Sequence, residues 1–221
     1  MSFAEEVQQY LEKGLKELGV SLTPEQAGKI VSFLSLLREF SEPLGLTAIK
    51  DPKEIAVKHA LDSLSVVRHL PDKGPILDLG TGAGLPGMII KIARPEQEVW
   101  LVDARKKPIS FLTYAAGVLG LKDIRIIQAT VGRKDPLPRG YFNCVVSRAV
   151  SELPLLWELA SPLLKREGFL LAMKGPRAGE EIEAFEKKFP ETIVDFKEFT
   201  LPITGDRRTL VFVKGSPSSG N

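Results

Sequence analysis

Sulfur, imidazole and long apolar runs are scarce in this sequence of 221 residues. The single cysteine, Cys144, excludes an intramolecular disulfide, and the two histidines, His59 and His69, lack the spacing of a metal site. No apolar stretch approaches the length of a membrane span, and the start, MSFAEEVQQY, lacks the basic segment and apolar run of a signal peptide. We therefore expect a cytoplasmic protein with no metal and no membrane association.

A strong excess of one charge is also lacking, because 30 lysines and arginines nearly balance 28 aspartates and glutamates. Their distribution is uneven, since residues 104–140 hold eight basic side chains against two acidic ones. Such a segment can steer a polyanion toward a site, although a solvated helix face with loop lysines would give the same pattern. The composition, 43% hydrophobic and 26% charged, is that of a globular protein able to bury a core.

The chain divides into two parts with different patterns of expected secondary structure. Residues 1–73 indicate helices, with start signals at Ser2, Thr23-Pro24-Glu25-Gln26 and Asp51-Pro52-Lys53-Glu54. In residues 74–214, apolar strands alternate with helical segments, which predicts an α/β domain with a mainly parallel sheet covered on both faces. The end, 215–221, predicts disorder. We expect strands near 75–79, 98–102, 124–128, 142–147, 168–173, 192–199 and 208–214, the last two antiparallel, and helices near 86–93, 106–119, 152–165 and 178–188.

The stretch ILDLGTGAGLPG, residues 76–87, offers two cofactor sites in overlapping registers. Gly82 to Gly87 fits G-x-G-x-x-G, the dinucleotide pattern, whereas Asp78 to Gly84 fits D-x-G-x-G-x-G, the loop of a methyl-donor site. Both registers need glycine, because the chain turns sharply off a strand and its backbone must approach a ligand. Both also suit Asp103, which closes the next strand and can accept hydrogen bonds from ribose hydroxyls.

Asp78 separates the two interpretations. A pyrophosphate lies at the positive N-terminus of a helix, so a carboxylate two residues before the first glycine would repel it. S-adenosylmethionine has no phosphate, and an acid is favourable beside its ammonium and sulfonium groups. The residues therefore favour a methyl-donor loop that starts at Gly80 and argue against a nicotinamide oxidoreductase. We expect Pro86 to help start the next helix and Gly87 to allow close packing on the sheet.

The loop and several stretches outside it resemble the RsmG family, which is also called GidB. Members of this family are bacterial methyltransferases that modify N7 of guanine 527 in 16S ribosomal RNA. The resemblance runs from about residue 36 to residue 214. Its most specific parts are His59–Asp62–Ser63, the Gly-Leu-Pro-Gly of the loop and Ser147-Arg148-Ala149. The matching stretches are LTAIKDPKEIAVKHALDSL (46–64), ILDLGTGAGLPGMIIKI (76–92), WLVDARKKPISFL (100–112), FNCVVSRAVSELPLL (142–156), AMKG (172–175) and RRTLVFVK (207–214).

The resemblance implies a seven-stranded, Rossmann-like, S-adenosylmethionine-dependent methyltransferase fold, with an N-terminal helical extension (1–73) and a methyltransferase domain (74–214). It implies S-adenosylmethionine as cofactor, and 16S ribosomal RNA, the small ribosomal subunit or an assembly intermediate as partner, with a monomer as our default. Together with Asp78 from the loop, the implied cofactor-binding residues are Gly80, Gly82, Leu85, Asp103, Val131, Gly132 and Arg148. Candidate RNA contacts are His59, Lys106, Lys107, Lys174 and Arg208, with Arg133, Lys134, Arg139 and Arg207 as further basic candidates.

Arg148 is our candidate catalytic residue. Guanine N7 carries a free lone pair, so no general base is needed and catalysis would come mostly from orientation. We expect Arg148 to hydrogen-bond the cofactor carboxylate or guanine O6; the structural alternative is a salt bridge to a helix-end acid such as Glu152. His59 and Asp62 lie one helical turn apart and could touch, and without the family this spacing favours a structural cap or surface pair over a catalytic dyad.

Among the departures from the family pattern, two fall on residues of the candidate site and affect single contacts. Thr130-Val131-Gly132 stands where the family has Arg-Ala-Glu or Arg-Val-Glu, so an acidic cofactor contact is missing, and Lys107-Pro108 replaces Lys-Arg. Two alternative functions stay open on the same fold. One is a small-molecule methyltransferase, which the basic segment argues against, and the other is a non-catalytic RNA-binding module, which the missing acid allows.

Overall fold

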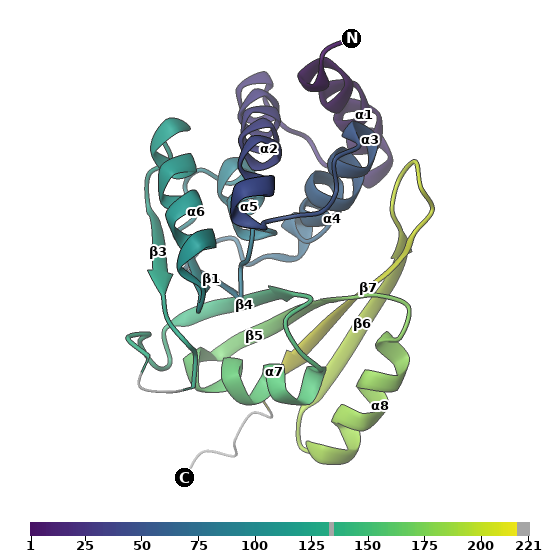
Figure 1. Ribbon diagram of the computed structural model, residues 1–221. Helices are drawn as coiled ribbons and strands as arrows, with labels where there is room; N and C mark the ends of the chain where they lie inside the picture. The colour runs from purple at the N-terminus through teal and green to yellow at the C-terminus, as the bar shows by residue number, and fades with distance from the viewer. Residues whose placement is uncertain (133–134, 216–221) are drawn as a thin grey trace.

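The computed structural model describes residues 1–132 and 135–215. Its centre is a seven-stranded sheet in the order β3-β2-β1-β4-β5-β7-β6, with β3 and β6 as the outer strands (Figure 1). The first five strands run parallel, whereas β7 runs antiparallel between β5 and β6, as expected for the last two strands. The bounds are β1 Ile76–Leu79, β2 Val99–Asp103, β3 Ile124–Gln128, β4 Phe142–Arg148, β5 Leu164–Lys174, β6 Ile193–Thr200 and β7 Arg207–Lys214.

The carboxyl ends of the parallel strands share one edge of the sheet. Asp103, at the end of β2, pairs in register with Gln128, at the end of β3. Because β7 runs in the opposite direction, its start reaches the same edge, where Thr209 pairs with Lys174 at the end of β5. The loops after β1, β2 and β4 therefore meet the start of β7 at the edge where open α/β sheets bind ligands.

Helices α1 to α6 cover one face of the sheet and α7 and α8 cover the other (Figure 1). The three expected start signals cap helices: Ser2 and Thr23 form capping boxes, and the Asp51 side chain accepts from Glu54 N–H over 2.8 Å. The helix bounds are α1 Phe3–Leu18, α2 Pro24–Leu44, α3 Pro52–Ile55, a π-helical turn η1 Ala56–Leu61, α4 Asp62–Leu64, α5 Gly87–Ala93, α6 Lys106–Val118, α7 Leu153–Ala160 and α8 Ala178–Lys188, with 3₁₀ turns at Val67–His69 and Ser161–Leu163.

Two details of the helices concern earlier expectations. The helix expected over 152–165 ends at Ala160, because Pro162 cannot continue it, and β5 begins at Leu164. Gly87 begins α5, and a Cβ there would overlap Leu101 of β2, so the expected close packing on the sheet is confirmed. Pro86 occupies the position just before this helix.

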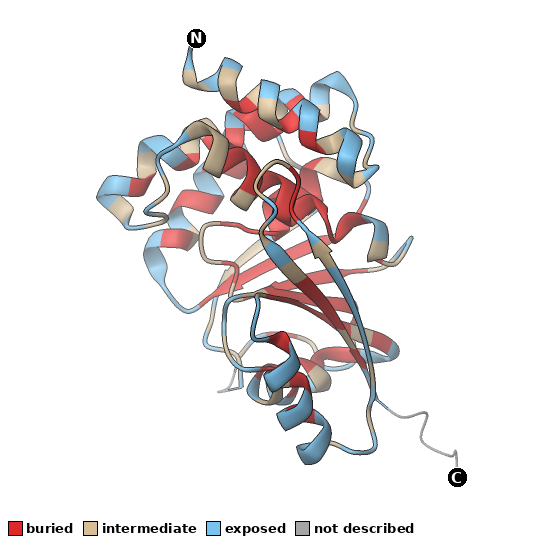
Figure 2. Cartoon of the chain, turned by 90° about the vertical axis from the view of Figure 1, so that its right-hand side faces the viewer, coloured by how far each residue is buried: buried red, intermediate tan, exposed pale blue. Residues whose placement is uncertain are grey.

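Each face of the sheet has its own core, and alternate strand residues serve the two. In β1, Ile76 belongs to the core under α1 to α6, whereas Leu77 and Leu79 belong to the core under α7 and α8. Figure 2 shows the buried centre of the sheet beside the largely exposed β6. Cys144 is fully buried as a free thiol, as expected for a small apolar residue.

The N-terminal extension shares its core with the sheet. Leu11 of α1 and Leu34 of α2 belong to the same buried cluster as Val99 of β2 and Val146 of β4. Within residues 1–132 and 135–215, no helix is long and apolar enough to cross a membrane. The candidate contacts Arg133 and Lys134, and residues 216–221 of the predicted tail, lie outside the described residues.

Candidate functional site

The glycine loop joins β1 to α5 through three left-handed residues. Gly80, Gly82 and Gly84 have φ values of 71°, 54° and 90°, a region that L side chains rarely adopt. The backbone N–H groups of Gly80 and Thr81 each donate to the Val102 carbonyl of β2 over 2.9 Å. The sharp turn expected from the sequence is present, and it starts at Gly80.

The three glycines have different surroundings. A Cβ on Gly80 would overlap the side chain of Val150, from the segment after β4, and a Cβ on Gly84 would overlap side chains of the apolar core. A Cβ on Gly82 would lie 3.4 Å from its nearest neighbour, Nη2 of Arg105, which is an ordinary van der Waals contact. Gly80 and Gly84 thus allow close packing, and Gly82 is the loop position with room beside it.

The side chain of Asp78, at the end of β1, forms hydrogen bonds that hold this loop in place. Its side chain is fully buried, and Oδ2 accepts from Thr81 Oγ1 over 2.6 Å and from Gly87 N–H over 2.8 Å. Burial raises the pKa of Asp78 to about 6, although these two hydrogen bonds oppose the rise. The other oxygen, Oδ1, has no hydrogen-bond partner in the described part of the chain, which leaves one buried acceptor at the base of the loop.

Asp103 lies beside the loop and is covered by Arg105. Its Oδ2 accepts from Gly82 N–H over 2.9 Å, and Arg105 donates to the carboxylate through its backbone N–H and its guanidinium over 2.9 to 3.2 Å. Burial favours a higher pKa, but these hydrogen bonds outweigh it and the pKa of Asp103 is lowered. Sequence reasoning missed Arg105; its signal was a cation two residues after the strand-end acid.

The segment after β3 carries Val131 and Gly132, and an acid does lie nearby. Gly132 N–H donates to Asp135 Oδ2 over 2.9 Å, and Leu137 N–H donates to Oδ1 over 3.2 Å. The Asp135 side chain is fully buried by these contacts and by Arg139. This chain lacks the acid that the family has at the position of Gly132, and the carboxylate three residues later, on Asp135, holds the backbone of this segment.

Arg148 is bound by the N-terminal extension. Its Nη1 donates to the Lys58 carbonyl over 2.7 Å and to Asp62 Oδ2 over 3.2 Å. Arg208 Nε donates to the other oxygen of Asp62 over 3.3 Å. The acid that pairs with Arg148 is therefore Asp62 and not Glu152, because the extension covers the face of the sheet on which Arg148 stands.

His59 and Asp62 take different partners. His59 Nε2 lies 3.0 Å from Thr47 Oγ1, whereas Asp62 binds the two arginines. Burial, followed by the nearby charge of Arg148, lowers the pKa of His59 to about 4. Burial raises the pKa of Asp62, and Arg148 and Arg208 oppose that rise. The structure thus gives His59 and Asp62 separate hydrogen bonds where the sequence suggested a mutual contact.

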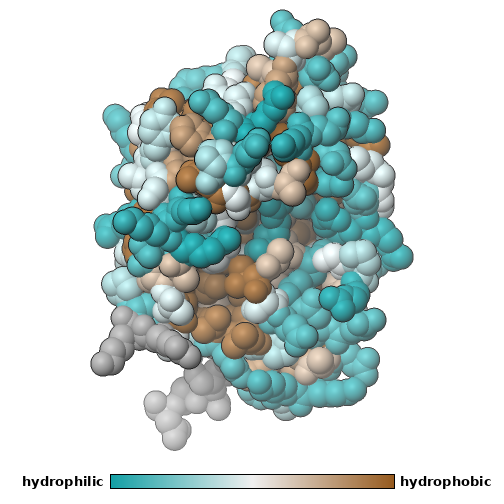
Figure 3. Space-filling model, in the orientation of Figure 1, coloured by the Kyte–Doolittle hydropathy of each residue, from teal (hydrophilic) through white to brown (hydrophobic). Residues whose placement is uncertain are grey.

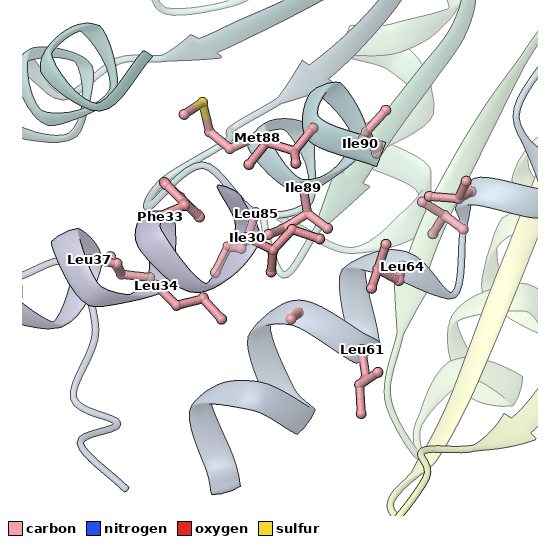
Figure 4. Close-up of a cluster of buried hydrophobic side chains, with 14 of the residues drawn as sticks. Ile30, Phe33, Leu34, Leu37, Leu61, Leu64, Leu85, Met88, Ile89 and Ile90 are labelled. Atoms are coloured by element: carbon pink, nitrogen blue, oxygen red, sulfur yellow. The ribbon is translucent and has the colours of Figure 1, made fainter. Parts of the chain in front are cut away.

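Besides Asp78 and Asp103, three further candidate side chains are buried, which limits what they can contact. His59 is 5% exposed. Lys174 is 8% exposed, and its ammonium donates to the Ser151 carbonyl over 2.7 Å and to Glu181 over 2.6 Å, so its charge is already paired. Leu85 points into the apolar core beside α2 and α5 (Figure 4).

The remaining RNA candidates lie at the surface. Lys106 and Lys107 begin α6 next to Asp103 and are exposed, and the Arg208 side chain is 22% exposed. Figure 3 shows a largely hydrophilic face with apolar side chains gathered near the level of α7. After β4, Val150 is 40% exposed and Leu155 is 50% exposed. Basic and apolar groups therefore both reach the surface near the carboxyl edge of the sheet.

The site fits a cationic, phosphate-free cofactor. It offers a backbone with room at Gly82, an ionised Asp103 within reach of that backbone, and a buried unpaired oxygen on Asp78. Among the described residues, no group of three His, Cys, Asp or Glu side chains could hold a metal ion.

Two solved methyltransferase structures share this architecture. A SAM-dependent methyltransferase from Aquifex aeolicus superposes with a TM-score of 0.56 at 18% identity, covering 81% of this chain and 97% of that one. A tRNA methyltransferase from B. subtilis superposes with a TM-score of 0.58 at 12% identity, covering 74% of this chain and 69% of that one. These likenesses show the Rossmann-like fold of S-adenosylmethionine-dependent methyltransferases.

The particular family follows from the sequence. The chain belongs to the GidB family, described as rRNA small subunit methyltransferase G, which matches residues 26–211. A protein of that name from Pelotomaculum thermopropionicum is 41% identical over 215 residues, covering 92% of this chain and 88% of its own length. One from Deinococcus radiodurans is 39% identical over 214 residues, covering 92% of this chain and 83% of its own length.

Proposed function

We propose that this protein transfers the methyl group of S-adenosylmethionine to N7 of guanine 527 in 16S ribosomal RNA. Membership in the small-subunit rRNA methyltransferase family, over residues 26–211, carries the proposal. The glycine loop with Asp78 and Asp103 supports the cofactor, and the exposed basic residues at the same edge support an RNA substrate.

Cofactor binding is assigned to the loops after β1, β2 and β3. Asp103 would accept hydrogen bonds from the ribose hydroxyls, which requires Arg105 to share or release that carboxylate. Oδ1 of Asp78 would be the acceptor for the ammonium group, and Gly82 would let the backbone approach. Val131 and Gly132 would border the adenine.

Orientation is the main task of the protein in this reaction. The cofactor supplies an electrophilic methyl group, and guanine N7 attacks it with a lone pair that carries no proton. No residue has to act as a base, and the lowered pKa of His59, about 4, keeps this imidazole neutral at pH 7. Arg148, at the end of the strand beside β1, would orient the substrate or cofactor.

The RNA contacts are assigned to exposed or partly exposed cations. Lys106 and Lys107 occupy the start of α6, where the helix dipole disfavours positive charge, so a bound phosphate would offset an existing cost. Arg208 joins them, whereas buried His59 and paired Lys174 serve to hold the structure. A ribosomal RNA substrate places the protein in the cytoplasm, and we propose that it acts as a monomer.

Methyl transfer tests the function directly. The protein is incubated with methyl-labelled S-adenosylmethionine and small ribosomal subunits, or 16S RNA, that lack the modification. We expect label at N7 of the single predicted guanine. Label at another atom, in small molecules only, or in neither despite cofactor binding would overturn the proposal.

The variant Gly80→Asp tests the cofactor site. Its side chain would overlap Val150 in a left-handed backbone position, so we expect the affinity for S-adenosylmethionine to fall about 100-fold or more, which is about 2.7 kcal/mol of binding free energy. Gly179→Asp is the matched control, because Gly179 lies in α8 with open space around it. Calorimetric titration measures both, and circular dichroism checks folding. Equal affinities in the two variants would show that the site lies elsewhere.

A further inference from the structure

The buried carboxylate of Asp62 lies between two arginines from different strands. Arg148 of β4 donates to Oδ2 over 3.2 Å, and Arg208 of β7 donates to Oδ1 over 3.3 Å. The arginine side chains are 21% and 22% exposed, so solvent reaches both. One buried acid thus binds two cations that both reach solvent.

The sheet aims both arginines at the same face. Arg148 pairs in register with Met173 of β5, and Met173 pairs with Leu210 of β7. Met173 and Leu210 belong to the core beneath the extension. Because residues two apart on a strand share a face, Arg208 stands on the face of Leu210, beside Arg148 at the ligand edge.

Each guanidinium keeps donors beyond those bonds. Arginine has five N–H groups in a planar fork that matches phosphate oxygens. The bonds of Arg148 go to the Lys58 carbonyl and Asp62, and those of Arg208 go to Asp62 and the Arg207 carbonyl. Three other acids lie near the two arginines and have partners of their own. Glu54 pairs with Lys58, Asp206 accepts from Thr204, and Asp78, which feels the charge of Arg148, accepts from Thr81 and Gly87.

We propose that Asp62 is a positioning residue that orients Arg148 and Arg208 as a paired site for a backbone phosphate of the RNA substrate. The proposal rests on the proposed function, because it takes the ligand to be RNA. The extension supplies the acid and the sheet supplies the cations, so the site is incomplete without residues 1–73. This gives the extension a part in substrate binding beyond covering the sheet.

The direction in which Asp62→Asn changes the affinity for RNA distinguishes a positioning role of Asp62 from a simple effect of its charge. Asp62→Asn removes a negative charge next to the RNA, so charge alone predicts tighter binding. Positioning predicts the opposite, and we expect the Kd for unmodified 16S RNA to rise about tenfold. Glu54→Gln is the control, since it removes a neighbouring acid that binds neither arginine and should leave RNA binding equal or tighter. An unchanged or lower RNA Kd for Asp62→Asn would overturn the proposal.

A second measurement counts phosphate contacts and does not depend on Asp62 variants folding. Arg208→Gln should flatten the slope of log Kd against log salt by about one, the loss of one phosphate contact. Arg125→Gln is its control, because Arg125 is an exposed arginine near the amino end of β3 that pairs with Glu98. An unchanged slope for Arg208→Gln, or a wild-type protein that binds no RNA, would refute the paired phosphate site.

These binding measurements need no methyl transfer, so they separate the two proposals. If wild-type protein binds 16S RNA without methylating it, the proposed function fails and the salt slopes still decide the arginine pair. If methylation occurs but Arg208→Gln keeps the wild-type slope, the function stands and the phosphate site falls.

Discussion

Burial acts in opposite directions on the acids and the imidazole near the site. It raises the pKa of Asp78 to about 6 and lowers the pKa of His59 to about 4, because it disfavours whichever form is charged. Above pH 6.5 both His59 and its unfolded counterpart are neutral. Below it, the unfolded chain takes up a proton at His59 that the folded chain resists until about pH 4.

This difference makes His59 a source of acid sensitivity. Its stabilising contribution is complete above pH 6.5, and about 2 kcal/mol of it should be lost between pH 7 and pH 5. Asp78 works the other way, since its raised pKa favours the folded state as the pH falls. Urea unfolding of wild type and His59→Gln at both pH values isolates the histidine, because Asp78 is common to both. Equal pH dependence in the two proteins would contradict the assignment.

At the scale of single residues, the sequence allowed the residues of the glycine loop to be predicted but not the ion pairs of the site. Asp78, Gly80 and Gly82 follow from a local pattern, and the left-handed glycines confirm the turn. Asp62 meets Arg148 and Arg208 only after 86 and 146 residues of intervening chain, and such pairings depend on how the extension docks. No local spacing encodes them.

At the scale of elements, α1 and α2 each contain one glycine, in opposite surroundings. Gly28 of α2 is exposed with open space around it, whereas a Cβ on Gly14 of α1 would overlap Leu61 of the π-helical turn. Gly28→Ala should raise the unfolding free energy by about 0.5 to 1 kcal/mol through helix propensity. Gly14→Ala should lower it by about 1 kcal/mol or more, because overlap in a filled interface exceeds that gain. Thermal and urea unfolding of both variants test the pair, and a stabilised Gly14→Ala would mean that α1 packs more loosely than it does here.

Element positions were predictable where local signals are strong. Capping boxes and Asp51 fixed the helix starts, and apolar runs located all seven strands. The end of α7 and the long β5 were placed less well, because the apolar run continues from helix into strand and Pro162 alone marks the change. The π-helical turn before Asp62 has no sequence signal of its own.

For the whole molecule, the shared core joins the extension to the sheet. Leu11 and Leu34 of the extension pack in one cluster with strand residues, and Asp62 adds ion pairs to β4 and β7. Residues 1–73 and 74–214 differ in their expected secondary structure, which suggested two parts from the sequence. That difference does not reveal how much apolar surface the two parts bury against each other.

We therefore expect a single cooperative unfolding transition. Calorimetric and van't Hoff enthalpies should agree for the full chain, and probes in the two parts should report one midpoint. The two tryptophans, Trp100 and Trp157, report on the sheet and α7 by fluorescence, while helical circular dichroism weighs the extension heavily. Two separated midpoints would show that the extension unfolds on its own.

The place of β7 in the sheet has a consequence for the order of events during synthesis. The last of the seven strands along the described chain is not an outer strand, since it inserts between β5 and β6. Until residues 207–214 have left the ribosome, β5 presents an unpaired row of backbone donors and acceptors, a surface prone to association with other chains. The same strand delivers Arg208, so the carboxylate of Asp62 waits for its second cation until that moment. The sheet is thus completed and the second arginine reaches Asp62 in one late step of synthesis and folding.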